Sequence, residues 1–340
     1  MGAISPLPLS DQNLAVILQA VGGKSVRSTE SVQSLWSGYG EIVRLNLDGG
    51  HASSVIVKWI DPPTNVNHPR GWNTDISHQR KLQSYQVEMA WYQHWAQRCN
   101  TYSRIPRCLF AGPLGSGQVI VMEDLDAAGF SERRDEVTRL DIENCLLWLA
   151  SFHAWSLDCE PKGLWPVGTY WHLATRPDEY AAMQNTQLKN AASAIDEKLS
   201  ACRFKSLVHG DAKLANFCFS PFGVNEGEGG VAAVDFQYVG GGCGMKDVAY
   251  FLGSCLDERQ CFEQQDELLD FYFAALTKQT SVIDPAIDTV ALEAEWRGMY
   301  ALACTDFTRF LNGWMPGHWK LNGYTKNQAM QAFDQLDISI

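Results

Sequence analysis

The chain has 340 residues, of which 46% are hydrophobic and 19% charged, and its formal net charge is −12. This composition excludes an intrinsically disordered chain and suits one large domain or two lobes with adequate cores. No apolar run approaches the roughly 18 residues that a membrane span needs. The acidic charge and the lack of a Lys/Arg-rich stripe argue against nucleic acid as a partner.

The N-terminal segment and the cysteines point to a cytoplasmic protein. Residues 1–13 contain neither a basic n-region nor an apolar h-region, so we expect no secretory signal. The ten cysteines are dispersed and form no C-x-x-C pair, which argues against a zinc site and a disulfide framework. We therefore expect reduced thiols packed in a core, as is usual in the cytosol.

A β-hairpin is the first clear element along the chain. Upstream, Gly22 and Gly23 mark the end of a helix. Residues 41–48 alternate apolar and polar side chains, as a half-buried strand does. Asp-Gly-Gly at 48–50 supplies turn chemistry, and residues 53–60 return as the partner strand. The Pro/Asn-rich segment 61–73 then predicts a loop.

A helix and one more strand follow. The helix is predicted from about Ser84, because Val87, Trp91 and Trp95 recur at intervals of four residues. Residues 118–122 form an apolar strand that ends at the acidic pair 123–124.

The second part of the chain is mainly helical. Residues 141–157 are apolar on most faces, as in a buried helix. Short strands are predicted at 216–219 and 231–236, and helical patterns resume from about Lys246. The sequence therefore predicts an α+β protein: a small antiparallel β-rich lobe with one helix, then a larger helical lobe that holds a hairpin.

The segment LVHGDAKLANFCF carries the densest chemical signal. His209 and Asp211 are followed by Asn216 at the spacing of a kinase catalytic loop, H-R-D-x-x-x-x-N. In that loop the carboxylate orients the hydroxyl nucleophile and the amide binds Mg²⁺. Asp235 ends a strand and precedes Phe236, which matches the place of the metal-binding Asp of D-F-G.

With these residues the chain resembles the aminoglycoside phosphotransferase/choline kinase superfamily, and most closely its ecdysteroid-kinase-like branch. The phrases HGDAKLANFCF, AVDFQYVGGGCGMKDVAYFL, SYQVEMAWY and VMEDL carry the resemblance, which extends from about Leu35 to Trp314. It implies a bilobal protein-kinase-like fold. Residues 1–124 would form the nucleotide-binding lobe, and residues 125–340 the helical lobe with catalytic loop and acceptor pocket.

The resemblance also implies a nucleotide site. Lys58 would hold the α- and β-phosphates of ATP, and Glu88 on the first helix would pair with it. Each of these two residues alone would also suit an ordinary surface. Met122, Glu123 and Leu125 would belong to the hinge, where backbone groups bond the adenine edge. The side chain of Glu123 need not touch the nucleotide.

A phosphate-covering turn and a metal site complete that expectation. Gly38 and Gly40 precede the first clear strand and would cover the phosphates, although a plain tight turn fits them equally well. Asn216 and Asp235 would hold Mg²⁺ on the phosphates of ATP.

Other residues near the motif have alternative readings. Asp211 would be the catalytic base, and Lys213 would either reach the γ-phosphate or remain a solvated loop lysine. His209 would brace the loop against the strand that bears the metal ligand. We expect Asp247 to cap its helix, with metal binding as the alternative, and residues 240–244 to form a turn into that helix.

The sequence does not decide which residues line the acceptor pocket. Asp306 and Arg309 are either pocket groups or a surface ion pair, and four tryptophans are candidates to line the pocket: Trp148, Trp155, Trp314 and Trp319.

The expected function is transfer of the γ-phosphate of ATP, with Mg²⁺, to the hydroxyl of a sterol-like, choline-like or aminoglycoside-like small molecule. A nucleotide-binding pseudokinase that acts as an interaction module is the alternative. A protein kinase fits poorly, because Gly210 and Gln237 replace the Arg and Gly of H-R-D and D-F-G. Only eleven residues also separate Asp235 from Asp247, too few for a long activation segment.

Overall fold

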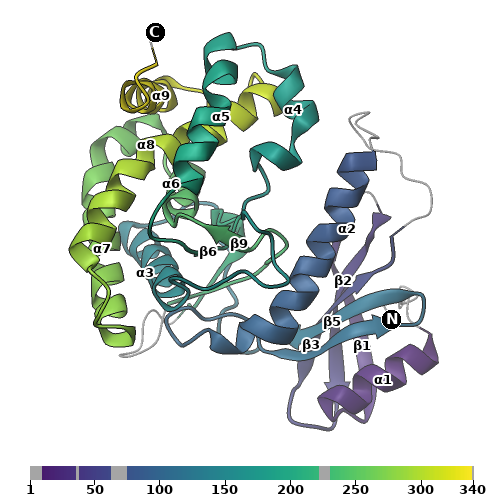
Figure 1. Ribbon diagram of the computed structural model, residues 1–340. Helices are drawn as coiled ribbons and strands as arrows, with labels where there is room; N and C mark the ends of the chain where they lie inside the picture. Colours follow the sequence, from purple (N-terminus) through teal and green to yellow (C-terminus); the bar gives the residue numbers. More distant parts are fainter. Residues whose placement is uncertain (1–9, 36–37, 63–74, 222–229, 339–340) are drawn as a thin grey trace.

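The chain folds into two lobes joined side by side (Figure 1). The computed structural model describes residues 10–35, 38–62, 75–221 and 230–338. The predicted loop 61–73 lies almost wholly outside this part of the chain. The α+β bilobal architecture expected from the sequence is confirmed.

The small lobe is built on a five-stranded antiparallel sheet. Its strands, in spatial order, are β1 (Ser25–Ser34), β2 (Gly40–Asp48), β3 (Ser54–Ile60), β5 (Gly117–Glu123) and β4 (Cys108–Leu114). The predicted hairpin is β2–β3 and the predicted strand 118–122 is β5, both confirmed.

Two strands of this sheet were not predicted, and both lie at its edges. Strand β1 is polar and mostly exposed, so it lacks the alternation that identifies a half-buried strand. Strand β4 contains Gly112 and Pro113, which weaken a strand pattern in sequence but are tolerated at a sheet edge.

Two helices accompany the sheet; the outline predicted from the sequence contains only one of them, while the glycine pair marks the end of the other. Helix α1 (Asp11–Val21) ends at Gly22, which is left-handed at φ 68°, as the glycine pair predicted. Helix α2 (Asp75–Ala90) begins before the expected Ser84, because its first residues are polar and carry no apolar stripe. It continues into a π-helical turn, Trp91–Trp95, and a 3₁₀ turn, Ala96–Arg98. In Figure 1, α2 runs between the sheet and the helical lobe.

The large lobe consists mainly of helices. Its first long helix, α3 (Arg139–Trp155), begins at a capping box formed by Thr138 and Asp141. The others are α4 (Pro177–Ala182), α5 (Thr186–Ser200), α6 (Met245–Cys255), α7 (Glu258–Ile283), α8 (Thr289–Trp314) and α9 (Gly323–Gln335).

Two short antiparallel strand pairs lie inside this lobe. Strand β6 (Ser206–Val208) pairs with β9 (Gly240–Gly242), so part of the glycine run that we expected to be a turn is a strand. Strand β7 (Phe217–Phe219) pairs with β8 (Val231–Ala233), the hairpin expected from the sequence. The segment between β6 and β7 and the segment between β8 and β9 therefore lie close together.

One large apolar cluster fills the helical lobe and extends to the sheet. Trp148 on α3 is fully buried there and stacks on Phe152 with ring centroids 5.0 Å apart, so it belongs to the core. All ten cysteines are described and unpaired, and six of them are buried. Among the helices of the described ranges, none combines the length and apolarity needed to cross a bilayer.

Candidate active site

A cavity of about 1140 Å³ opens between the sheet, helix α2 and the helical lobe. Among the predicted site residues, Gly38 and Gly40 do not line it. The others all do: Lys58, Glu88, Met122, Glu123, Leu125, Asp211, Lys213, Asn216 and Asp235.

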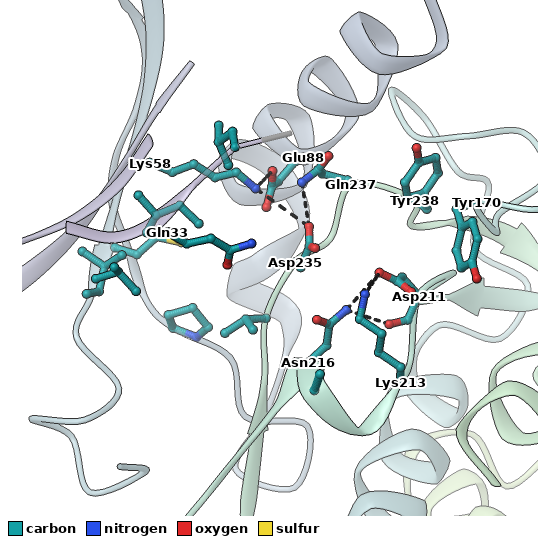
Figure 2. A pocket seen from close by; sticks show the side chains of 18 of the residues that line it. Gln33, Lys58, Glu88, Tyr170, Asp211, Lys213, Asn216, Asp235, Gln237 and Tyr238 are labelled. Carbon is teal, nitrogen blue, oxygen red and sulfur yellow. Dashed lines mark hydrogen bonds and ion pairs between the residues drawn. The ribbon is translucent and has the colours of Figure 1, made fainter. Parts of the chain in front are cut away.

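Lys58 on β3 and Glu88 on α2 form a buried ion pair. Lys58 Nζ lies 2.6 Å from Glu88 Oε2, and the side chains are only 3% and 2% exposed. Burial by itself would lower the pKa of Lys58, but the charges of Glu88 and Asp235 outweigh it and raise that pKa. The ammonium is therefore held charged and fixed in direction at one wall of the cavity (Figure 2).

Asp211 lies at the opposite wall, where three side chains contact its carboxylate. Oδ2 accepts hydrogen bonds from Lys213 Nζ at 3.0 Å and Asn216 Nδ2 at 3.1 Å. Oδ1 accepts one from the Tyr250 hydroxyl at 3.1 Å, and that hydroxyl is 3.3 Å from the hydroxyl of Tyr170. Burial raises the pKa of Asp211 despite the neighbouring Lys213, and the charge of Asp235 raises it further.

The loop that carries Asp211 is held by hydrogen bonds to the side chain of Asp247. The Asp247 carboxylate accepts the backbone N–H groups of His209 at 2.5 Å and Gly210 at 2.9 Å. It also contacts His153 Nε2 at 3.2 Å, and it is fully buried. Asp247 therefore fixes the loop that carries Asp211, and the helix-capping role expected for it is wrong: α6 has no side-chain cap.

Gly210 is required at the centre of this loop. Its φ is 78°, and a Cβ there would lie 2.1 Å from the Tyr238 carbonyl oxygen. A side chain such as the Arg of H-R-D would collide with that backbone. One of the differences from protein kinases, glycine in place of the Arg of H-R-D, is thus required by the packing of this loop.

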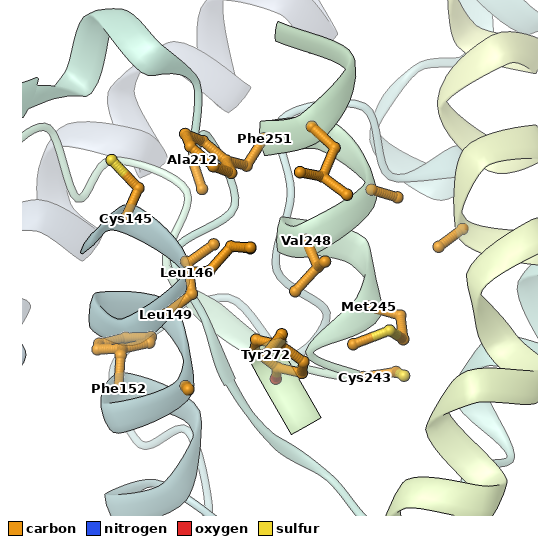
Figure 3. Close-up of a cluster of buried hydrophobic side chains, with 14 of the residues drawn as sticks. Cys145, Leu146, Leu149, Phe152, Ala212, Cys243, Met245, Val248, Phe251 and Tyr272 are labelled. Carbon is orange, nitrogen blue, oxygen red and sulfur yellow. The ribbon is translucent and has the colours of Figure 1, made fainter. Parts of the chain in front are cut away.

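His209 braces the loop as predicted. Its Nε2 lies 3.0 Å from the carbonyl oxygen of Val234, and its Nδ1 accepts the N–H of Asp211 at 3.2 Å. Behind it, Ala212 is buried in the apolar cluster with Leu146 of α3 (Figure 3). The loop is therefore tied both to the strand before Asp235 and to the core.

Asp235 is held in an unusual backbone conformation, with φ at 69°. Its Oδ1 accepts a hydrogen bond from Gln237 Nε2 at 2.8 Å and lies 3.8 Å from Lys58 Nζ. Burial would raise the pKa of Asp235, but the positive charges of Lys58, Lys81 and Lys213 together lower it. The carboxylate is therefore ionised and directed into the cavity, as Figure 2 shows.

Asn216 and Asp235 supply oxygen ligands of the kind that Mg²⁺ prefers. The amide nitrogen of Asn216 donates to the backbone oxygen of Asp211 at 2.8 Å, so its oxygen is the atom left for a cation. The described residues contain no cluster of three or more His, Cys, Asp or Glu suited to a metal. A magnesium ion held by few protein ligands and by phosphates fits this set.

The predicted hinge contributes apolar walls and a structural acid. Met122 and Leu125 are nearly buried and line the cavity. The Glu123 carboxylate accepts Arg104 Nη2 at 2.7 Å and the Arg107 N–H at 3.0 Å. The Glu123 side chain thus stabilises the chain around the hinge.

Gly40 is the first residue of β2, and Gly38 lies two residues before it. Both have positive φ, and a Cβ on Gly40 would lie 2.0 Å from the Trp59 carbonyl oxygen. The close approach of β3 therefore requires glycine at position 40. The side chain between them, Tyr39, does line the cavity.

The family follows from comparison with known proteins. The model of the ecdysteroid kinase-like family matches residues 49–163 and 168–284, more than half of the chain. The chain belongs to the ecdysteroid kinase-like family. This membership confirms the resemblance seen in the sequence and makes the chain a phosphotransferase of the small-molecule kinase type.

Solved structures confirm the fold of this family member. An amicoumacin kinase in complex with AMP-PNP and Ca²⁺ aligns with a TM-score of 0.52 at 14% identity, over 96% of this chain and 93% of the other. A choline kinase from Cryptosporidium parvum aligns with a TM-score of 0.52 at 9% identity, over 96% and 97%. Both support the bilobal kinase-like fold. A comparison with curated protein sequences finds no match.

The far end of the cavity differs from the sequence expectation. Of the four candidate tryptophans only Trp314 lines it, while Trp319 is 59% exposed. Asp306 and Arg309 form a fully buried ion pair, neither in the cavity nor on the surface.

Sequence reasoning also missed part of the lining. Among the missed residues are Arg80, Lys81, Tyr170, Arg176, Glu179, Gln237, Tyr238, Tyr250 and Phe310. Lys81 had a usable signal, since it precedes Glu88 by seven residues and so shares its helix face.

Proposed function

We propose that this family member transfers the γ-phosphate of ATP to the hydroxyl of a small molecule and requires Mg²⁺. The observation that carries the proposal is that one cavity holds the Lys58–Glu88 pair on one wall and the Asp211 carboxylate on the other. Such a transfer requires a positively charged group that binds the phosphates and a catalytic base that accepts the proton of the hydroxyl.

The sheet wall would hold the nucleotide. We assign the adenine ring of the nucleotide to the space lined by Ile42, Ile56, Met122 and Leu125. This space lies at the hinge between residues 1–124 and 125–340. Lys58, kept in place by Glu88, would contact the phosphates. Asn216 and Asp235 would hold Mg²⁺, which when bound neutralises charge on the phosphates.

The helical wall would hold the acceptor. Asp211 Oδ1 would accept a hydrogen bond from the acceptor hydroxyl and orient its oxygen toward the γ-phosphorus. As the new O–P bond forms and the bond to the β-phosphate oxygen breaks, the hydroxyl proton passes to Asp211. ADP and the phosphate ester are the products. Lys213 lies beside Asp211 and would stabilise the charge that develops on the transferred group.

The unpaired thiols bear on the cellular compartment in which the protein works. Ten free cysteines, several of them buried, favour a reducing environment such as the cytoplasm.

The test is ADP release with a panel of hydroxyl compounds, with and without Mg²⁺. We expect ADP and a phosphate ester in equal amounts with at least one compound, and no product without Mg²⁺ or with Asp235→Asn. Tight nucleotide binding with no turnover on any compound would favour the pseudokinase alternative.

A further inference from the structure

Helix α2 presents two neighbouring cations, Arg80 and Lys81, to the cavity. Arg80 donates to the Thr175 carbonyl oxygen at 2.7 Å and to the Ser77 hydroxyl at 3.1 Å. Lys81 donates to Gln237 Oε1 at 2.8 Å. These partners are neutral, and within the described ranges no ion pair joins either cation to an acidic side chain.

The acidic groups nearby are already engaged by other cations. Glu179 lies 3.0 Å from Arg176, and Asp211 lies 3.0 Å from Lys213. Asp235 is nearest to Lys58, at 3.8 Å. Burial lowers the pKa of both Arg80 and Lys81, and it outweighs the opposing charges of Glu179 near Arg80 and of Asp235 near Lys81. Among the described residues, Arg80 and Lys81 therefore line the cavity without an acidic side chain in direct contact.

Three aromatic residues of the acceptor wall, Tyr170, Tyr250 and Phe310, are also in contact with the protein's own cations. The Arg176 guanidinium lies 5.2 Å from the ring centroid of Phe310 and 5.7 Å from that of Tyr170. Lys320 Nζ lies 5.4 Å from the ring centroid of Tyr250. A ligand cation would compete with these side chains for the same rings and would meet two further cations nearby.

We propose that Arg80 and Lys81 form an oxyanion subsite on the α2 wall of the cavity, and that the acceptor is an acidic alcohol: a hydroxyl compound that also carries a carboxylate, sulfate or phosphate group. The inference rests on the proposed function for the identity of the reacting hydroxyl. The acidic group would be paired by Arg80, whose planar guanidinium suits two oxygens, and by Lys81. The aromatic wall would contact the apolar body of the compound.

The subsite is tested with three compounds on one scaffold: 4-(hydroxymethyl)benzoate, its methyl ester and 4-(aminomethyl)benzyl alcohol. Calorimetric titration in the presence of AMP-PNP and Mg²⁺ measures their affinities without turnover. Wild-type protein should bind the benzoate at least about 10-fold more tightly than the ester, the range of a charge-assisted hydrogen bond, and the amine most weakly.

Matched variants distinguish binding by a specific subsite from a general effect of the protein's net charge. Arg80→Met and Lys81→Met should each weaken benzoate binding about 10-fold or more and leave ester binding unchanged. Lys278→Met removes the same charge from an exposed position on α7 and should change neither. Thermal unfolding of each variant, and Arg80→Lys as a charge-retaining substitution, distinguish loss of the subsite from loss of the fold.

Three results would contradict the subsite. No benzoate preference, a preference for the amine, or loss of AMP-PNP affinity in place of benzoate affinity would overturn the subsite; the last would assign both cations to the phosphates of ATP. If the binding pattern holds while no alcohol is phosphorylated, the subsite stands and the proposed transfer fails.

Discussion

The Tyr250 hydroxyl donates a hydrogen bond to Asp211 Oδ1 across 3.1 Å, from helix α6 to the catalytic loop. Tyr250 is nearly buried and has Tyr170 as its other hydroxyl neighbour. The carboxylate oxygen that would receive the acceptor's proton is thus oriented by a residue outside the loop motif.

Tyr250→Phe removes that hydrogen bond to the ionised carboxylate, so the pKa of Asp211 should rise. We expect the acid limb of the kcat profile to move to higher pH by about one unit, with nucleotide affinity unchanged. Tyr180→Phe, which removes a hydroxyl outside the cavity, is the matched control. A profile identical to that of the wild type would show that Tyr250 has no positioning role.

Glu88→Gln leaves Lys58 buried without its closest counter-charge. Asp235 remains at 3.8 Å, so we expect a loss in unfolding free energy of about 3 kcal/mol, at the lower end for a broken buried pair. Denaturant unfolding measures it. Glu143→Gln breaks the more exposed pair with Arg139 and should cost less than about 1 kcal/mol. Equal losses in the two variants would argue against a buried functional pair.

Asp211→Asn tests how much the buried, ionised carboxylate of Asp211 destabilises the folded state. The folded-state pKa of Asp211 is raised, so ionisation destabilises the folded state as pH rises from the unfolded value of about 3.9 through the folded pKa. The uncharged variant should therefore unfold at the same or a higher temperature than the wild type at pH 7. The difference should vanish below about pH 4. A clear loss of stability at pH 7 would contradict the raised pKa.

Asp247→Ala would leave the buried N–H groups of His209 and Gly210 without an acceptor. We expect a loss of about 2 kcal/mol or more, and faster hydrogen exchange at these two amides. Asp247→Asn keeps one carbonyl oxygen and should lie between Ala and wild type. Unchanged exchange at His209 and Gly210 in the Ala variant would show that another group holds the loop.

The sequence identified the residues whose spacing is fixed by chemistry. Asp211, Asn216 and Asp235 must meet one metal and one hydroxyl, so their order along the chain carries information that survives without structure. Lys58 and Glu88 could be predicted only from the resemblance, because a strand lysine and a helix glutamate look like surface residues. Their partnership appears only when β3 and α2 pack together.

What could not be predicted depends on contacts between distant segments. The edge strands β1 and β4 show no apolar alternation, because exposure and Pro113 hide it. Asp247 looked like a helix cap because its backbone partners, His209 and Gly210, are far away in sequence. The acceptor wall is assembled from α2, α4, α6 and α8, so no local pattern reveals it.

Asp211 as the base is tested by the transfer of labelled γ-phosphate from ATP to an alcohol, compared between wild-type protein and Asp211→Asn at equal nucleotide occupancy. We expect label in a phosphate ester with the wild type. With the variant we expect at least about a 100-fold slower reaction while AMP-PNP binds both proteins equally. Transfer by Asp211→Asn at the wild-type rate would contradict the assignment of the base, and with it the proposed mechanism.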